Sequence, residues 1–251
     1  DAFGRLESSI AVEATERMVN LAASGLKIVF IAGNHDYPEV SRRFFGKSMV
    51  KALFGHLSDL GIYVVDEQAE FVRLDSGHVI LGIPYRETYE QFEETCLRPI
   101  QTYIKNGTEK MLEDKIIPCW HVGLPFGTAW RGDENENDWI SEDHEAIKRL
   151  FSIAYNHQIF CGHYHGPSEE PCGDLGSFIY IGSPSTRSRA ESDQDKRTVS
   201  WTDGRVTSNS THLHLDKMVS SVEGASEHTQ LMVRLFGDEV IPLLRVHINL
   251  G

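Results

Sequence analysis

Long apolar segments are missing from this sequence. It contains no run of about 18 apolar residues, so it predicts no transmembrane helix. Its start shows no charged segment followed by an apolar one, so we expect no signal peptide and no membrane association. Basic residues are also scarce, since 24 Lys and Arg stand against 37 Asp and Glu, for a net charge of −13. Taken alone, this charge argues against a protein wrapped in nucleic acid, although a local basic groove is compatible with it.

Paired cysteines are missing as well. The four cysteines (Cys96, Cys119, Cys161 and Cys172) form no CxxC motif. We interpret them as incidental thiols of a reduced cytoplasmic protein. The chain begins with Asp1 and not with methionine, which favours a fragment or a processed form. Its 251 residues suit one large domain, or one domain with an appendage.

The apolar pattern predicts alternating helices and strands. Residues 8–24 have helical spacing and end at Gly25, and the near-continuous apolar run 27–32 is typical of a buried parallel strand. Together they favour an α/β fold. Further strands are predicted within residues 61–67, 71–85 (with a turn at Ser76–Gly77), 115–123, 158–166 and 177–185, and helices over 87–114 and 142–156.

The pattern changes after Gly204. Residues 211–219 and 243–250 alternate like half-exposed strands, and residues 220–230 are rich in Ser, Gly and Glu. We therefore predict a main domain over residues 1–205. Residues 206–251 are predicted to be a C-terminal extension or the start of a capping domain.

Three predicted strands share one kind of ending. "VFIA" runs into Asn34 and His35, "IIPCW" runs into His121, and "QIFCG" runs into His163 and His165. Ligands of open α/β sheets bind at the carboxyl ends of strands, so these side chains could converge at one edge. A histidine near a strand end is usually an ordinary polar residue, but three such endings are hard to obtain by chance. Imidazole nitrogen with amide oxygen suits divalent ions such as manganese, iron or zinc.

These endings resemble the motifs of the calcineurin-like metallophosphoesterases. The sequence carries "GNHD" at 33–36, the isolated His121, and "GHYH" at 162–165. The resemblance covers residues 1–190 approximately, and it implies an α/β/β/α sandwich. It further implies that Asn34, His121 and His163 hold one metal ion and that His165 holds a second.

The same resemblance gives roles to the residues around the metals. It implies that His35 faces the substrate phosphate and that Asp36 fixes the loop. The family's DxH motif and the Gly-Asp of GDxxD are absent, so the first strand and its metal motif are missing from the sequence. Asp1 lies 33 residues before Asn34, a spacing that suits the last Asp of GDxxD. Asp1 is then the expected catalytic partner that orients His35.

Smaller features resemble the SbcD-type DNA exonucleases and their phage relatives. These are "GIPYRE" at 82–87, "YIGSPSTRS" at 180–188 and "SDQDKR" at 192–197, although the glycine expected next is Thr198. This branch implies DNA as the substrate, a role in DNA repair or recombination, and an SbcC-type ATPase subunit as a partner. A homodimer is a further expectation.

Two basic stretches flank the same predicted strand ends. We predict that Arg42, Arg43, Lys47, Arg187 and Arg189 form a cationic rim that contacts a phosphate backbone. Solvated helix faces are the alternative interpretation of these residues.

The sequence therefore predicts a two-metal phosphodiesterase, with a nuclease favoured. Two divalent ions are expected, Mn²⁺ first, with Fe, Zn or Mg as alternatives. His35 is expected to stabilise the developing charge or to protonate the leaving oxygen. The chain as given is expected to be nearly inactive as a nuclease, because most ligands of the second ion are missing. The alternatives are a small-molecule phosphodiesterase or phosphatase, and a non-catalytic module that binds a partner through the same fold.

Overall fold

The computed structural model of the protein describes eight stretches of the chain. They are residues 8–37, 47–106, 114–124, 145–183, 196–202, 205–212, 215–219 and 244–248. Within them, no helix has the length and apolar character needed to cross a membrane. The chain divides into two compact units: Asp1–Tyr164 with Ser168–Tyr180, and His165–Pro167 with Ile181–Gly251.

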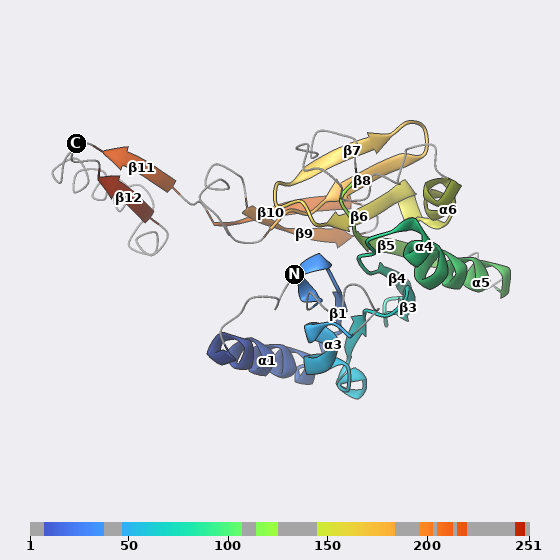
Figure 1. The fold of residues 1–251 in the computed structure, drawn as a ribbon, viewed down its shortest axis with the longest axis horizontal. Helices are drawn as coiled ribbons and strands as arrows, with labels where there is room; N and C mark the ends of the chain where they lie inside the picture. The colour runs from blue at the N-terminus through green and yellow to red at the C-terminus, as the bar shows by residue number, and fades with distance from the viewer. Residues whose placement is uncertain are drawn as a thin grey trace. The chain divides into compact units, whose positions relative to one another are not determined.

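The first unit combines helices and strands in alternation (Figure 1). Its elements are α1 (Ser8–Ala23), β1 (Ile28–Ile31), η1 (Asn34–Asp36), α3 (Met49–Phe54), η2 (Ser58–Leu60), β2 (Ile62–Val65), β3 (Glu70–Arg73), β4 (His78–Ile83), α4 (Tyr89–Phe92), the π-helical η3 (Glu93–Leu97), α5 (Arg98–Asn106), β5 (Lys115–His121), α6 (Glu145–Ile153), η5 (Tyr155–His157), β6 (Gln158–Gly162), β7 (Ser168–Cys172) and β8 (Gly176–Tyr180).

Six strands form the central sheet in the order β3-β4-β5-β6-β8-β7. The pairs β4–β5, β5–β6 and β6–β8 are parallel, whereas the outer pairs β3–β4 and β7–β8 are antiparallel. Parallel strands are usually covered on both faces and consist of apolar runs, as β4, β5 and β6 do. The predicted turn between β3 and β4 is confirmed, because Gly77 has a φ of 83° there.

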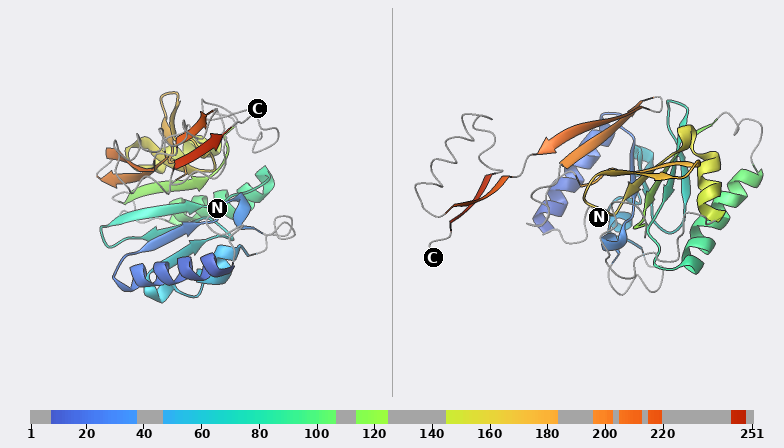
Figure 2. Two further views of the ribbon diagram at one scale, coloured as in Figure 1. Left: turned by 90° about the vertical axis from the view of Figure 1, so that its left-hand side faces the viewer. Right: turned by 90° about the horizontal axis from the view of Figure 1, so that it is seen from above.

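The larger hydrophobic core lies between this sheet and α4, α5 and α6, which cover one of its faces (Figure 2). Phe92 of α4 stacks on Trp120 of β5 with ring centroids 5.2 Å apart. Phe151 of α6 meets Phe178 of β8 edge-on at 5.0 Å. Aromatic pairs of this kind stabilise a core beyond the area that they bury.

A second, smaller core lies between the parallel pair β1–β2 and the helices α1 and α3. Phe30 of β1 stacks on Phe54 of α3 at 4.9 Å. The prediction of a parallel strand at residues 27–32 is confirmed, but the strand is only partly buried and not buried as predicted. All four residues of β1 are partly exposed, because among the described strands β1 pairs along its length with β2 alone.

The β1–β2 pair and the six-stranded sheet meet where β2 approaches β4. A Cβ atom on Gly82 would lie 2.6 Å from Cγ2 of Val65, a distance that real contacts do not reach. Glycine is therefore required at this point of β4. The fold is thus a mixed α/β architecture in which helices flank a central multi-stranded sheet, as the sequence predicted.

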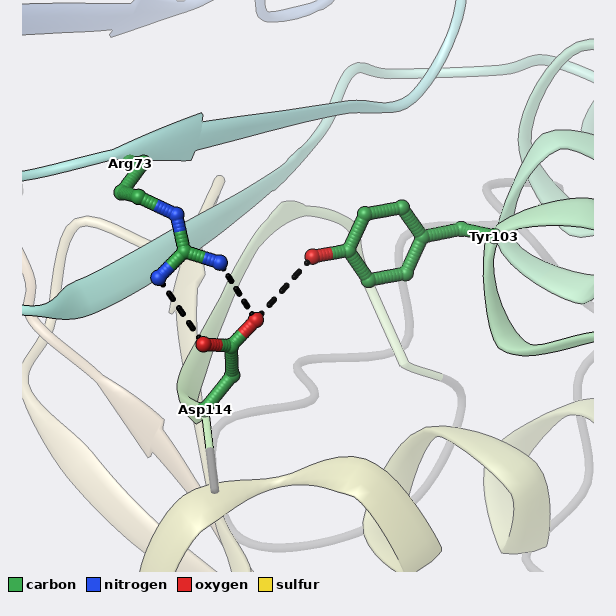
Figure 3. Close-up of polar contacts among 3 residues, drawn as sticks. All are labelled: Arg73, Tyr103 and Asp114. Carbon is green, nitrogen blue, oxygen red and sulfur yellow. Dashed lines mark hydrogen bonds and ion pairs between the residues drawn. The ribbon is translucent and has the colours of Figure 1, made fainter. Parts of the chain in front are cut away.

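The predicted helix over residues 87–114 is only partly correct. Helical structure runs from Tyr89 to Asn106 and is interrupted by the π-helical η3, while residues 107–113 lie outside the described part. Asp114 is not helical and instead joins three elements (Figure 3). Its carboxylate accepts hydrogen bonds from Arg73 at 2.8 and 2.6 Å and from the Tyr103 hydroxyl at 3.4 Å. This clip ties β3 and α5 to the start of β5.

The sequence missed β7. Its segment, "SEEPC", contains proline and two acids, which are depleted in strands. Such residues are tolerated here because β7 is an edge strand that pairs only with β8 among the described residues.

The second unit contains two strand pairs. Its strands are β9 (Lys196–Thr202), β10 (Arg205–His212), β11 (Leu215–Val219) and β12 (Leu244–Ile248). The pair β9–β10 is antiparallel and β11–β12 is parallel, so the strands expected within 211–219 and 243–250 are confirmed. The predicted domain boundary between residues 205 and 206 stays a prediction.

Candidate metal centre

Three of the predicted site residues lie at the carboxyl ends of strands in the first unit. His121 is the last residue of β5, and His163 follows the last residue of β6. Asn34 opens η1, three residues after the end of β1. In the register of the β5–β6 pair, His121 stands opposite Gly162. The sheet topology therefore brings both histidines to one edge, as the sequence predicted.

Asn34 and His121 are in direct contact. Nε2 of His121 lies 3.1 Å from Oδ1 of Asn34, and the side chains are only 8% and 4% exposed. Because the amide oxygen can only accept, the imidazole nitrogen donates in this hydrogen bond while no ion is bound, and it would have to give up this proton to ligate an ion. Bonds from a divalent ion to such atoms are about 2.0–2.2 Å long, so two ligands at right angles lie ~3 Å apart. The spacing of these two atoms therefore fits a pair of ligands on one ion.

His163 completes the group. Its ring lies edge-on to that of His121, with centroids 5.4 Å apart. Tyr85, which follows β4, packs against both rings: it stacks on His163 at 6.4 Å and meets His121 edge-on at 6.2 Å. Tyr85 is not among the residues predicted from the sequence, although it follows a strand end as the histidines do.

Two glycines make room for the two imidazoles. A Cβ atom on Gly123 would lie 2.8 Å from Cδ2 and 2.9 Å from Nε2 of His163. A Cβ atom on Gly162 would lie 3.1 Å from Nδ1 of His121. Each histidine thus packs against the glycine that accompanies the other one in sequence. Side chains at these two positions would displace the candidate ligands.

His163 is held in an unusual backbone conformation. Its φ is 100°, in a region that residues other than glycine rarely adopt. Backbone outliers of this kind concentrate at functional sites, where the surrounding structure maintains them. The outlier at His163 therefore supports a functional role for this residue.

The segment after His121 is braced by two tyrosines. The Tyr180 hydroxyl donates to the Val122 carbonyl at 3.1 Å and accepts from the Leu124 N–H at 3.1 Å. The Tyr164 hydroxyl donates to the Leu124 carbonyl at 2.8 Å. Burial raises the pKa of Tyr180 well above its ordinary value, so its hydroxyl stays protonated. Gly123 is consequently held in place between two anchored residues.

The GNHD turn places its three polar residues differently. His35 is exposed, whereas Asn34 and Asp36 are buried. Oδ2 of Asp36 accepts the N–H of Gly33 at 2.9 Å, and the N–H of Asp36 donates to the Gly33 carbonyl at 3.1 Å. Asp36 thereby fixes the turn, as expected, and His35 is left at the surface beside a candidate ligand.

Several predicted residues cannot be placed. Asp1, Arg42, Arg43, Arg187 and Arg189 lie outside the described residues. Lys47 is described and exposed, and its contact with DNA stays a prediction. His165 belongs to the second unit, where its carbonyl accepts the Ser183 N–H at 3.0 Å. Its role as a ligand of a second ion also stays a prediction.

A buried polar network around Arg86 contacts Tyr37, the residue that follows the GNHD turn, and it was not predicted from the sequence. Arg86 is 6% exposed and donates through Nη1 to the Tyr37 hydroxyl at 3.2 Å. The Tyr37 hydroxyl donates in turn to the Asp66 carbonyl at 3.0 Å. Burial raises the pKa of Tyr37 well above its ordinary value, so this donor is kept. The only sequence signal was a polar pair, Tyr85-Arg86, directly after the Pro84 turn.

The donor atoms of the site decide which kind of metal ion it could hold. Within the described residues there is no group of three or more His, Cys, Asp or Glu side chains that could hold one. The group formed by Asn34, His121 and His163 is not of that kind, because one of its donors is the amide oxygen of Asn34. One amide oxygen and two imidazoles suit ions such as Mn²⁺, Fe²⁺ or Zn²⁺. The residues present therefore fit one divalent ion.

Comparisons with known proteins assign most of the chain to one family. Residues 3–167, about two thirds of the chain, match the family model described as calcineurin-like phosphoesterase. A comparison with curated proteins found no match.

Proposed function

The chain belongs to the calcineurin-like phosphoesterase family, a family of metal-dependent phosphoester hydrolases, and from this premise we propose that it is a phosphodiesterase that cleaves DNA. The observation that carries the proposal is the buried contact of 3.1 Å between Asn34 and His121, with the His163 ring beside it. These residues supply one set of ligands in a family that uses divalent metals. His165 is the proposed ligand of a second ion.

The ions, when bound, supply Lewis-acid polarisation of the phosphate and activation of water. Asn34, His121 and His163 would hold one of them, and the buried side chain of Asn34 has little freedom to move away from it. His35 lies next to Asn34 and is exposed, so a substrate phosphate can reach its ring. We propose that His35 donates a proton to the leaving oxygen, with Asp1 as the residue that orients it.

The choice of DNA rests on sequence segments similar to those of SbcD-type exonucleases and on the predicted basic rim. The same resemblance supports an SbcC-type ATPase as a partner, and the donor set of imidazole nitrogen and amide oxygen supports Mn²⁺ as the ion. A small phosphodiester is the second candidate substrate, and the net charge of −13 favours it because an acidic protein repels a polyanion.

Calorimetry with Mn²⁺ and a cleavage assay test the proposal together. The assay compares end-labelled linear DNA with a nucleotide phosphodiester, in Mn²⁺ and in chelator. His121→Ala should abolish Mn²⁺ binding, while His56→Ala, at an exposed histidine after α3, should leave it unchanged.

Each result has a distinct meaning. Binding that survives His121→Ala would overturn the metal centre. Cleavage of the small ester without cleavage of DNA would keep the chemistry and reject DNA as the substrate. An ion that binds without cleavage of either substrate, in a chain to which the DxH and GDxxD ligands have been restored, would favour a non-catalytic module.

A further inference from the structure

Arg86 uses its whole guanidinium group in buried hydrogen bonds. Nη1 donates to the Tyr85 carbonyl at 2.6 Å and to the Tyr37 hydroxyl at 3.2 Å. Nη2 donates to the carbonyls of Asp66 and Glu67 at 2.8 and 2.6 Å, and Nε donates to Thr95 Oγ1 at 2.6 Å. Arginine has five N–H donors in a fixed planar fork, and these five bonds engage all of them.

One nitrogen of this fork, Nη1, bonds to residues beside both parts of the candidate metal centre, which are the turn that carries Asn34 and the two histidines. Nη1 donates to the carbonyl of Tyr85, whose ring packs against His121 and His163. Nη1 also donates to the hydroxyl of Tyr37, which directly follows η1, the turn that carries Asn34. A single side chain therefore bears on both the turn and the histidines.

Backbone hydrogen bonds couple the same segments. The Tyr85 N–H donates to the Ala32 carbonyl at 3.0 Å, and the Ala32 N–H donates to the Val65 carbonyl at 3.0 Å. Asp66 follows Val65 and is fully buried, and its Oδ2 accepts the N–H of Ser48, the N-cap of α3, at 2.8 Å. The carboxyl ends of β1, β2 and β4 are thus joined around Arg86.

We propose that Arg86, acting through Tyr37 and Tyr85, is a positioning residue that sets the distance between Asn34 and the two histidines. The inference rests on the proposed function, because it assigns a role toward the metal ion of that site. Lysine cannot take over this role, since its point charge lacks the planar fork that satisfies several acceptors together. Partners that orient metal ligands typically change metal affinity by about 10–100-fold when they are removed.

The test compares three variants of the full chain. Arg86→Lys removes the fork but keeps the charge, and Tyr37→Phe removes only the hydroxyl between Arg86 and Asp66. Arg73→Lys is the matched control, because it likewise replaces a guanidinium group that joins separate elements, but Arg73 belongs to the clip at the start of β5. For each variant, the Mn²⁺ dissociation constant is measured by calorimetry and the stability of the metal-free protein by urea unfolding.

We expect Mn²⁺ to bind about tenfold more weakly to Tyr37→Phe, the equivalent of about one hydrogen bond. Arg86→Lys should lose about 10–100-fold. Arg73→Lys should bind as the wild type does, even where its urea midpoint falls as far as that of Tyr37→Phe. That separation of affinity from stability distinguishes positioning from a merely structural role.

Wild-type affinity in Tyr37→Phe would overturn the inference, and this variant decides the question if Arg86→Lys does not fold. A loss of affinity in Arg73→Lys that matches its loss of stability would overturn it too. A wild-type protein that binds no Mn²⁺ would overturn the proposed function, and this inference with it. Wild-type binding with unchanged variants would overturn the inference alone.

Discussion

Replacement of Gly123 by alanine should disturb the metal centre through one methyl group. The new Cβ would lie 2.8 Å from Cδ2 and 2.9 Å from Nε2 of His163. Gly123 is not among the glycines with positive φ, so the alanine backbone itself is unstrained. The clash must be relieved by movement of either residue 123 or the imidazole.

The imidazole should be the part that moves. Val122 and Leu124, on either side of Gly123, are both hydrogen-bonded to the buried Tyr180 hydroxyl. Ordinary contacts between heavy atoms are about 3.5–4.0 Å, so Nε2 of His163 must retreat by roughly 0.6–1.1 Å. Metal–ligand distances tolerate only about ±0.2 Å, so His163 should be lost as a ligand. We expect Mn²⁺ affinity to fall by about 10–100-fold, at a stability cost of about 1–3 kcal/mol.

Calorimetry with Mn²⁺ and urea unfolding are the appropriate measurements. Gly77→Ala is the matched control, because Gly77 has a φ of 83° and a Cβ atom added there would meet no atom within 4 Å. This substitution should cost about 1–2 kcal/mol of stability through its left-handed backbone and leave metal binding unchanged. Wild-type affinity in Gly123→Ala would refute the assignment of His163 as a ligand.

Three further predictions concern other parts of the molecule. In a protein that carries the DxH and GDxxD ligands as well, His35→Ala should keep bound metal, by elemental analysis, and lower turnover by about 10²–10⁴-fold, since the exposed ring is the proposed proton donor; loss of metal would contradict this role. Arg73→Ala should lower the midpoint of urea unfolding, because it removes two hydrogen bonds from the buried carboxylate of Asp114, and an unchanged midpoint would disprove this. Burial raises the pKa of Cys161 well above its ordinary value of 9.0, so above about pH 9 the unfolded thiol ionises while the folded thiol keeps its proton. Stability should then fall with rising pH by up to ~1.4 kcal/mol per unit from this group, with a shallower slope in Cys161→Ala, and equal slopes would exclude the effect.

The strands that lead into the site were predictable from the sequence because their signal is local. Apolar runs followed by Asn34, His121 and His163 are visible one segment at a time, and the rule for parallel sheets brings their ends together. The burial of β1 was overestimated for the opposite reason. An apolar run shows that a segment prefers to be buried. Its actual exposure depends on which other parts of the chain pack against it, and the segment alone does not determine them.

The support of the site could not be predicted, because it depends on partners that lie far apart in sequence. Arg86 contacts Tyr37 and Asp66, which are 49 and 20 residues away. Gly123 gives no signal by itself, since its importance comes from His163, which directly follows the neighbouring strand β6. The conformation of His163 is likewise imposed by its surroundings, because the intrinsic preference of histidine opposes it.

The strand order β6-β8-β7 has a consequence for folding during protein synthesis. The ribosome makes β7 before β8, yet β8 is the strand that pairs with β6. The apolar edge of β6 must therefore wait for the chain to reach Tyr180, about 1–4 s at ~5–20 residues per second. An unpaired edge of this kind can pair with other nascent chains. Slow codons between Gly162 and Tyr180 should lengthen the exposure and lower the soluble yield, whereas the same codons placed after Tyr180 should not.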